Sequence, residues 1–158
     1  MSVRLPRASD VFALVREATR HILRHPVVGV AAAARTEDGR WLLIRRRDTG
    51  GWALPGGTLE WGESLGPAIA RELAEEAGVD VLAPCQLFNV YSKQERDYRF
   101  HAVTVLVTAV VSEPLRPPKN PLEIAEARIF HDSELPASLS MGMSDMLDDV
   151  RKGRRVLE

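Results

Sequence analysis

The sequence contains one cysteine, few aromatic residues and almost no net charge. Because Cys85 has no second cysteine to pair with, the chain forms no internal disulfide, and we expect it to work in the reducing cytoplasm. Aromatic residues make up 6% of the 158 residues, and the net charge of -1 gives no electrostatic reason to expect a nucleic-acid partner. No apolar run approaches the length of a membrane span, and the arginine-bearing start lacks a signal-peptide core, so we expect no membrane association.

The length of 158 residues, with 45% hydrophobic and 27% charged residues, is typical of one globular domain with a core of its own. We expect residues 26–158 to form a single α/β domain. Residues 1–25 are expected to carry an amphipathic helix, because apolar residues recur at helical spacing between Val11 and Ile22. That helix could cover the domain's own sheet or contact a second subunit, and the second arrangement would give a homodimer.

Apolar and β-branched runs predict the strands of a layered domain, at 27–34, 41–46, 81–91, 99–111 and 123–130. Asp38-Gly39 is typical of a hairpin turn between the first two. Gly56 and Gly57 follow a proline, which indicates a sharp turn or a close approach to a ligand. A last helix is expected at 144–152, and the four prolines between 114 and 121 predict a stiff surface loop.

The stretch from Gly57 to Val79 has the strongest chemical signal. A helix should begin near Ser64 and end at Gly78, with Glu72, Glu75 and Glu76 on one face, since residues three and four apart are neighbours on a helix. Three adjacent carboxylates repel one another unless a positive charge lies between them. Hard divalent cations prefer oxygen ligands, so the pattern predicts a site for Mg²⁺, or for Mn²⁺.

These residues resemble a known family. The chain matches every position of the signature of the Nudix hydrolases, namely Gly57, Glu63, Arg71, Glu72, Leu73, Glu75, Glu76, Gly78 and Val79. The resemblance extends over about residues 26–136, and the segment 96–101 is similar to that of small bacterial ADP-ribose pyrophosphatases. It implies an α/β/α sandwich with a mixed β-sheet.

The same resemblance implies an activity, the Mg²⁺-dependent hydrolysis of a pyrophosphate bond in a nucleoside diphosphate linked to another group. The second group stays open between the ribose of ADP-ribose and other sugars. Two alternatives remain: hydrolysis of (deoxy)nucleoside triphosphates, and a domain that senses nucleotides without cleaving them.

By resemblance, the metal ligands are Glu72, Glu75, Glu76 and the carbonyl of Gly56. Glu72 is the first candidate for the general base, while Glu63 and Arg71 would position the other groups. Arg71 cannot accept a proton, so we expect it to pair with Glu75 or Glu63.

Residues outside the signature supply further candidates. Three more glutamates could act as the base, namely Glu95, Glu123 and Glu126. The side chains that could bind substrate are Arg45, Arg47, Arg96, Arg99 and Glu126. Three aromatic residues could stack on a nucleotide base: Trp52, Phe88 and Tyr91.

Overall fold

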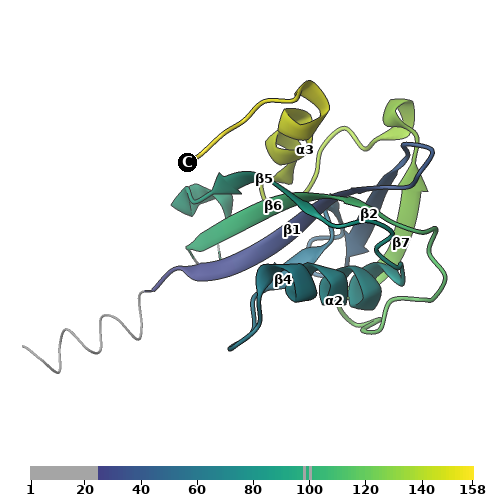
Figure 1. The fold of residues 1–158 in the computed structure, drawn as a ribbon, viewed down its shortest axis with the longest axis horizontal. Helices are drawn as coiled ribbons and strands as arrows, with labels where there is room; N and C mark the ends of the chain where they lie inside the picture. The colour runs from purple at the N-terminus through teal and green to yellow at the C-terminus, as the bar shows by residue number, and fades with distance from the viewer. Residues whose placement is uncertain (1–24, 98, 100) are drawn as a thin grey trace, which may run out of the picture.

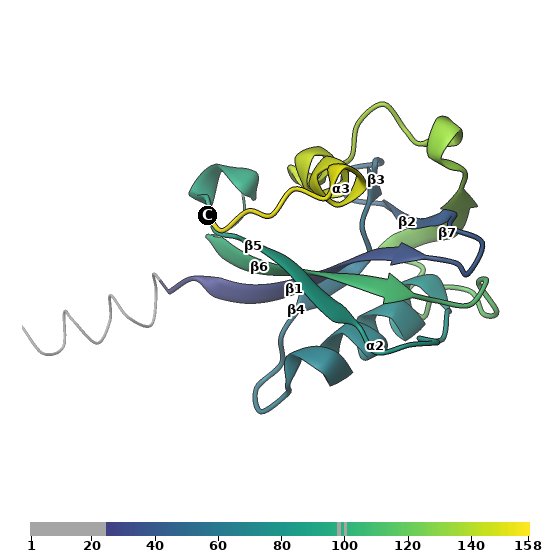
Figure 2. The same ribbon diagram turned by 45° about the horizontal axis from the view of Figure 1, so that its top comes forward.

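The computed structural model describes residues 25–97, 99 and 101–158; the expected N-terminal helix therefore lies outside the described residues. A mixed sheet occupies the centre of the described part, with helix α2 (Leu65–Ala77) on one face and helix α3 (Met143–Lys152) on the other (Figure 1). The view in Figure 2 shows the same three layers. These layers confirm the expected α/β/α sandwich.

The sheet of the described residues has seven strands, which are β1 (Val27–Arg35), β2 (Trp41–Arg46), β3 (Trp52–Ala53), β4 (Gly56–Thr58), β5 (Gln86–Tyr91), β6 (Ala102–Val110) and β7 (Ile124–Phe130). Two short 3-10 helices lie between elements, η1 (Gln94–Arg96) and η2 (Asp132–Glu134). The expected strands over 27–34 and 41–46 are confirmed almost to the residue. The expected strand over 99–111 begins only at Ala102, and β4 was not expected, because the sequence predicts a sharp turn at Gly56 and Gly57.

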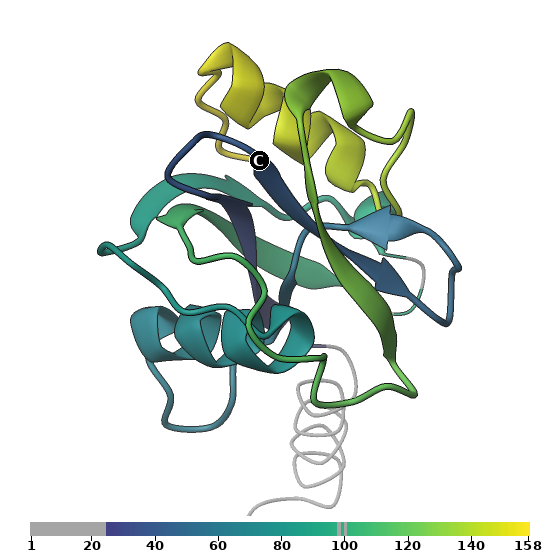
Figure 3. The same ribbon diagram turned by 90° about the vertical axis from the view of Figure 1, so that its right-hand side faces the viewer.

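The strand pairing separates β1 from β2 soon after their turn. These two strands share only the pair Arg35↔Trp41, after which β2 pairs with β7 and β3. Strand β1 instead runs parallel to β6 along its whole length and antiparallel to β4. Figure 3 shows that the pair β2 and β7 runs in a different direction from the pair β1 and β6. The turn at Asp38-Gly39 is therefore present, but the two strands diverge beyond it.

Alternating side chains divide the core between the two faces of the sheet. Val30, Ala32 and Ala34 of β1 pack towards α2, whereas Ala31 and Ala33 pack towards α3. In a strand, successive side chains point to opposite faces, so a continuous apolar run fills both layers. This burial on both faces is the reason why the run at 30–34 lacks polar residues.

Helix α2 has the boundaries that its sequence predicts. Ser64 precedes it in an extended conformation, although the serine side chain makes no capping hydrogen bond. Gly78 ends it in the left-handed region at φ 64°, where its N–H donates to the carbonyl of Ala74 at 3.2 Å. A Cβ at Gly78 would come within 1.9 Å of the carbonyl oxygen of Arg116, so only glycine fits. These two ends fix the register of the glutamates along the helix.

No helix among the described residues is long and apolar enough to cross a membrane.

Candidate active site

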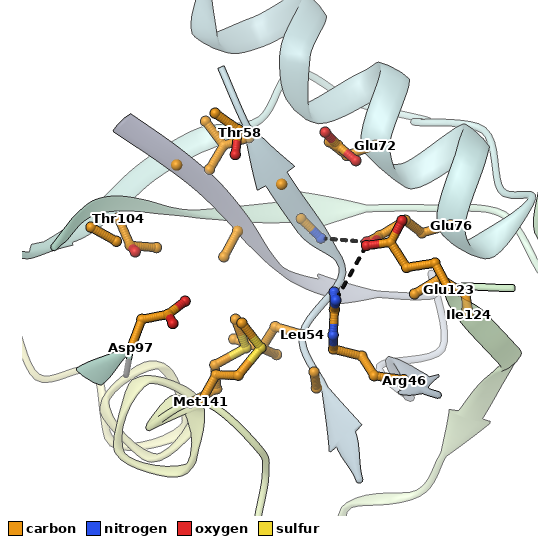
Figure 4. A pocket seen from close by; sticks show the side chains of 18 of the residues that line it. Arg46, Leu54, Thr58, Glu72, Glu76, Asp97, Thr104, Glu123, Ile124 and Met141 are labelled. Atoms are coloured by element: carbon orange, nitrogen blue, oxygen red, sulfur yellow. Dashed lines mark hydrogen bonds and ion pairs between the residues drawn. The ribbon is translucent and has the colours of Figure 1, made fainter. Parts of the chain in front are cut away.

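A pocket of about 590 Å³ lies between α2, the ends of β1 and β4, the segment after η1 and the start of α3 (Figure 4). Its polar lining includes Arg46, Arg71, Glu72, Glu75, Glu76, Arg96, Asp97, Arg99, Thr104, Lys119, Asn120 and Glu123. Its apolar lining includes Leu54, Ile124, Met141, Met143 and Met146. Pockets of this size hold small organic ligands.

Helix α2 brings the three signature glutamates to this pocket. Glu72 and Glu76 are buried, at 9% and 8% exposure, and both point into the cavity in Figure 4. On the same helix, Ile69 and Leu73 pack in the apolar core. Each glutamate already has a partner: Glu72 pairs with Arg71 at 2.8 Å, Glu75 pairs with Lys119 at 2.5 Å, and Glu76 accepts a backbone hydrogen bond.

Burial changes the proton affinity of two of these glutamates. Desolvation raises the pKa of Glu76 from its ordinary value of 4.5 to about 8, although the N–H of Gly56 donates to its Oε2 at 2.7 Å. Desolvation also raises the pKa of Glu72, and the guanidinium of Arg71 opposes this shift. Burial therefore disfavours the charged form of both side chains, and a bound metal cation would favour it.

Arg71 joins the loop before α2 to the helix. Its Nε and Nη2 each donate to the carboxylate of Glu63 at 3.0 Å, and its Nη1 donates to Glu72 at 2.8 Å. The guanidinium holds the pKa of Glu63 below its usual value. The expected pairing with Glu63 is therefore present, but the alternative with Glu75 is wrong, because Glu75 faces Lys119 instead. Glu63 does not line the pocket.

The glycines before α2 allow the backbone to pass close to the glutamates. A Cβ on Gly57 would lie 2.3 Å from Oε1 of Glu72, and a Cβ on Gly56 would lie 2.1 Å from the carbonyl oxygen of Val30. Both distances are far below a normal contact: the backbone leaves no room for a Cβ at Gly56, whereas a Cβ at Gly57 would displace the side chain of Glu72. The loop thus forms a cradle of backbone groups beside the carboxylates.

The donor set fits a hard divalent cation in its chemistry. As they stand, no three His, Cys, Asp or Glu side chains among the described residues lie close enough together to hold a metal ion. The reason is that the glutamates are engaged with Arg71, Lys119 and Gly56. Residues four apart on a helix have Cβ atoms about 5–6 Å apart, so rotation of the Glu72 and Glu76 side chains would suffice to bring their oxygens together. All these ligand atoms are oxygens, the type that Mg²⁺ and Mn²⁺ prefer.

The arginines expected to bind substrate fall into two groups. Arg45 and Arg47 do not line the pocket: Arg45 pairs with Glu126 at 2.8 Å on the neighbouring strand, and Arg47 donates to the carbonyl of Pro121. Arg46, which the sequence reasoning passed over, lines the pocket instead. Arg46 shares its face with Leu42 and Ile44, whose side chains pack towards α2, but Trp41 and Leu43 make the other face of β2 apolar as well, so alternation alone does not mark the face that meets the pocket.

Arg96 and Arg99 do line the pocket, and both are held by carboxylates. Arg96 makes charged hydrogen bonds of 2.7–2.9 Å with Asp145 and Glu158, which raise its pKa further. Arg99 donates from Nε and Nη2 to Asp97 at 3.0 and 2.7 Å. The structure thus connects both arginines to acidic residues that the sequence reasoning did not consider.

Of the remaining candidates, one lines the pocket and the others do not. Glu123 lines it, next to Arg46 at 3.2 Å, whereas Glu95 and Glu126 lie outside. None of the three aromatic candidates lines the pocket. The hydroxyl of Tyr91 donates to Asp149 in the core at 2.8 Å, and Trp52 packs edge-on against Phe130. The expectation that Tyr91 could stack on a base is therefore wrong, since it is 1% exposed.

Comparisons with known proteins identify the family of this chain. Residues 24–150 match the family model of the NUDIX domain. A "MutT-like protein" from Streptomyces ambofaciens is 46% identical over 44% of the chain, and an ADP-ribose pyrophosphatase from Methanocaldococcus jannaschii is 34% identical over 71%. The matches span 44% and 66% of these relatives' own lengths. The crystal structure of a MutT NUDIX hydrolase from Burkholderia pseudomallei aligns with a TM-score of 0.69 at 30% identity, covering 80% of the chain and 99% of that structure.

Proposed function

The chain belongs to the Nudix family, and from this premise we propose that it hydrolyses the pyrophosphate bond of a nucleoside diphosphate linked to a second group. We propose ADP-ribose, or a related nucleotide sugar, as the substrate. The observation that carries this proposal is the convergence of Glu72, Glu75 and Glu76 with Gly56 and Gly57 on one pocket of about 590 Å³. Its volume lies within the range of sites that enclose small ligands.

Divalent metal ions are generally used in this family. In this chain, Glu72, Glu75, Glu76 and the carbonyl of Gly56 would hold the ion, and we propose Mg²⁺, with Mn²⁺ as a substitute. When bound, such an ion neutralises phosphate charge and makes a water molecule easier to deprotonate. A carboxylate cluster would otherwise repel a pyrophosphate, so binding of the substrate here depends on that charge compensation.

The residues of the chain then have separate tasks in the hydrolysis. Glu72 accepts the proton of the attacking water, since it lines the pocket and borders the loop of Gly57 beside the site proposed for the ion. Arg71 keeps Glu72 and Glu63 in register through hydrogen bonds of 2.8–3.0 Å. Arg46, at 10% side-chain exposure beside Glu123, supplies positive charge to the phosphates.

ADP-ribose is proposed over other substrates because the relative from Methanocaldococcus jannaschii has the name ADP-ribose pyrophosphatase and matches 71% of the chain. Nucleoside triphosphates remain the alternative substrate class. Both classes place a chain of phosphates against the same glutamates, so only the products distinguish them.

A substrate panel tests the proposal. The purified protein is incubated with ADP-ribose, other nucleotide sugars and the nucleoside triphosphates, with Mg²⁺ or Mn²⁺, and the products are identified by mass spectrometry. AMP with ribose 5-phosphate is the expected result, and Glu72→Gln or Glu76→Gln should lower turnover by about a hundredfold or more. Pyrophosphate released from a triphosphate would indicate the alternative. Binding without turnover of any compound would instead indicate a sensing domain and overturn the proposal.

A further inference from the structure

The pocket has a second wall that faces the glutamates. It is formed by Asp97 after η1, Thr104 of β6, and the methionines at the start of α3, and Figure 4 shows Asp97 and Met141 on the opposite side of the cavity from Glu72 and Glu76. The phosphates of a substrate belong beside the glutamates. The second wall then lies beside the part of the substrate that is not phosphate, within the same pocket.

Asp97 is a fixed and nearly buried acceptor in that wall. Its side chain is 9% exposed, and Arg99 contacts both of its oxygens. Oδ1 accepts from the backbone N–H and from Nε of Arg99 at 2.9 and 3.0 Å, and Oδ2 accepts from Nη2 at 2.7 Å. The same guanidinium keeps the pKa of Asp97 low. The side chain therefore stays charged and in one orientation at neutral pH.

One acceptor position of this carboxylate stays open among the described residues. A carboxylate offers about four lone-pair sites, and the three hydrogen bonds from Arg99 use two on Oδ1 and one on Oδ2. Oδ2 can therefore accept one more hydrogen bond, from the cavity. A phosphate oxygen cannot donate this hydrogen bond, because a phosphate of a pyrophosphate carries no proton at neutral pH and is negatively charged like Asp97.

A sugar hydroxyl suits this position best. Hydroxyls donate readily to carboxylates, and acidic side chains bind ribose hydroxyls in this way in dinucleotide-binding folds. Thr104 adds another hydroxyl to the same wall, and Met141, Met143 and Met146 add flexible, polarisable surface for the flat or apolar parts of a nucleoside. A deoxyribose would leave the buried charge of Asp97 with one hydrogen bond fewer.

Building on the proposed function, we propose that Asp97 accepts a hydrogen bond from one ribose hydroxyl of the substrate and selects ribose over deoxyribose at that position. The contact could involve either ribose of ADP-ribose, since both carry hydroxyls. Arg99 acts through Asp97 as a positioning residue, because it fixes the direction of the carboxylate.

Matched substrates test this selectivity. Wild type, Asp97→Asn and Asp97→Ala are assayed for kcat/KM with ADP-ribose and with four analogues, each lacking the 2- or 3-hydroxyl of one ribose. The wild-type protein should cleave one analogue about tenfold or more less efficiently than ADP-ribose, because a hydrogen bond to a charged group is lost. The ratio of kcat/KM for ADP-ribose to kcat/KM for that analogue should fall several-fold in Asp97→Asn and approach one in Asp97→Ala. The affected analogue identifies which ribose is bound.

Asp148→Asn is the matched control, because Asp148 also pairs with cationic side chains but lies outside the pocket. It should leave the ratio unchanged. A wild-type ratio that persists in Asp97→Ala, or four analogues cleaved as well as ADP-ribose, would overturn the proposal. The dissociation constants of the same ligands, measured by calorimetry, separate the two proposals. If the loss of affinity for one analogue disappears in Asp97→Ala but no compound is cleaved, the proposed hydrolysis is wrong and the ribose contact is supported. If the wild-type protein binds neither ADP-ribose nor any analogue, the proposed contact is wrong.

Discussion

The backbone N–H of Gly56 donates a hydrogen bond of 2.7 Å to Oε2 of Glu76, joining strand β4 to helix α2. It is the one hydrogen bond that the described residues donate to this buried carboxylate. One such bond does not compensate for the loss of water around a negative charge, so the pKa of Glu76 rises to about 8. A cation bound beside Glu76 would therefore stabilise its charged form.

Glu76→Gln should stabilise the metal-free protein as the pH rises. A carboxyl whose pKa is raised on folding contributes its full stability below pH 4.5 and loses it as the pH rises through about 8. Glutamine keeps the acceptor for Gly56 but never ionises. At pH 8, the variant should be more stable than wild type by about 1 kcal/mol or more, since one pKa unit corresponds to about 1.4 kcal/mol.

Thermal unfolding in a chelator between pH 4.5 and 9 measures this difference. Glu37→Gln, an exposed glutamate outside the pocket, provides the control. Added Mg²⁺ should stabilise wild type and have little effect on Glu76→Gln. A difference in stability that does not change with pH would contradict the assignment of a buried, destabilised carboxylate.

Gly57→Ala should lower activity much more than stability. The added Cβ would meet Oε1 of Glu72 at 2.3 Å, and this flexible side chain can move aside without unfolding the protein. Gly56→Ala meets the backbone of Val30 at 2.1 Å, which cannot move as easily, so it should cost about 1–3 kcal/mol of unfolding free energy.

Gly66→Ala is the control for both variants, because nothing lies within 4 Å of its Cβ. Helix propensity alone should make it neutral or slightly stabilising. Turnover and the midpoint of thermal unfolding are measured for all three proteins. If Gly57→Ala retained wild-type turnover, Glu72 would not need its observed position for catalysis.

The contrast between Glu76 and Arg46 shows how much of the site could be predicted from the sequence. The register of the glutamates depends on one helix, whose period is regular and whose end is marked by Gly78, so their common face could be predicted. Arg46 depends on which face of β2 meets the pocket. The run Arg45-Arg46-Arg47 has no apolar residue to mark that face, and both faces of β2 before it are apolar.

The second wall of the pocket could not be predicted in the same way. Asp97, Thr104 and Met141 come from three separate segments, and their meeting depends on how η1, β6 and the start of α3 pack on the sheet. No local pattern encodes such non-local contacts. Strand β4 was missed for a similar reason: its ladder forms only because β1 leaves β2 after one pair.

Arg46→Lys should weaken substrate binding more than Arg45→Lys. Arg46 lines the pocket and is held by two hydrogen bonds of 3.0 Å to Asp48, so its planar group is fixed in direction; lysine keeps the charge but not this geometry. Arg45 pairs with Glu126 outside the pocket. We expect KM to rise about tenfold for Arg46→Lys and to change less than threefold for Arg45→Lys, as expected for loss of one charged hydrogen bond. Equal KM values for both variants would show that Arg46 does not bind substrate.

Apart from substitutions of Glu75 and Glu76, Glu72→Gln should lower kcat more than the substitution of any other glutamate. Glu72 lines the pocket and borders the loop of Gly57, so its carboxylate lies beside the site proposed for the cation and the attacking water. General-base catalysis contributes about 10²–10⁴-fold, so a loss of that size is expected. Glu123 lines the same pocket but is engaged by Arg46 at 3.2 Å, so Glu123→Gln should have a smaller effect.

Glu95→Gln and Glu126→Gln are the controls, since both residues lie outside the pocket, and kcat should stay within a few-fold of wild type. The pH dependence of kcat identifies the base more directly than the size of the loss. Removing the base should abolish the fall in kcat on the acidic side of the profile, whereas removing a residue that only holds charge should lower kcat at every pH. If that acidic limb persisted in Glu72→Gln and disappeared in Glu123→Gln, the proton would go to Glu123, and Glu72 would act only in binding the cation.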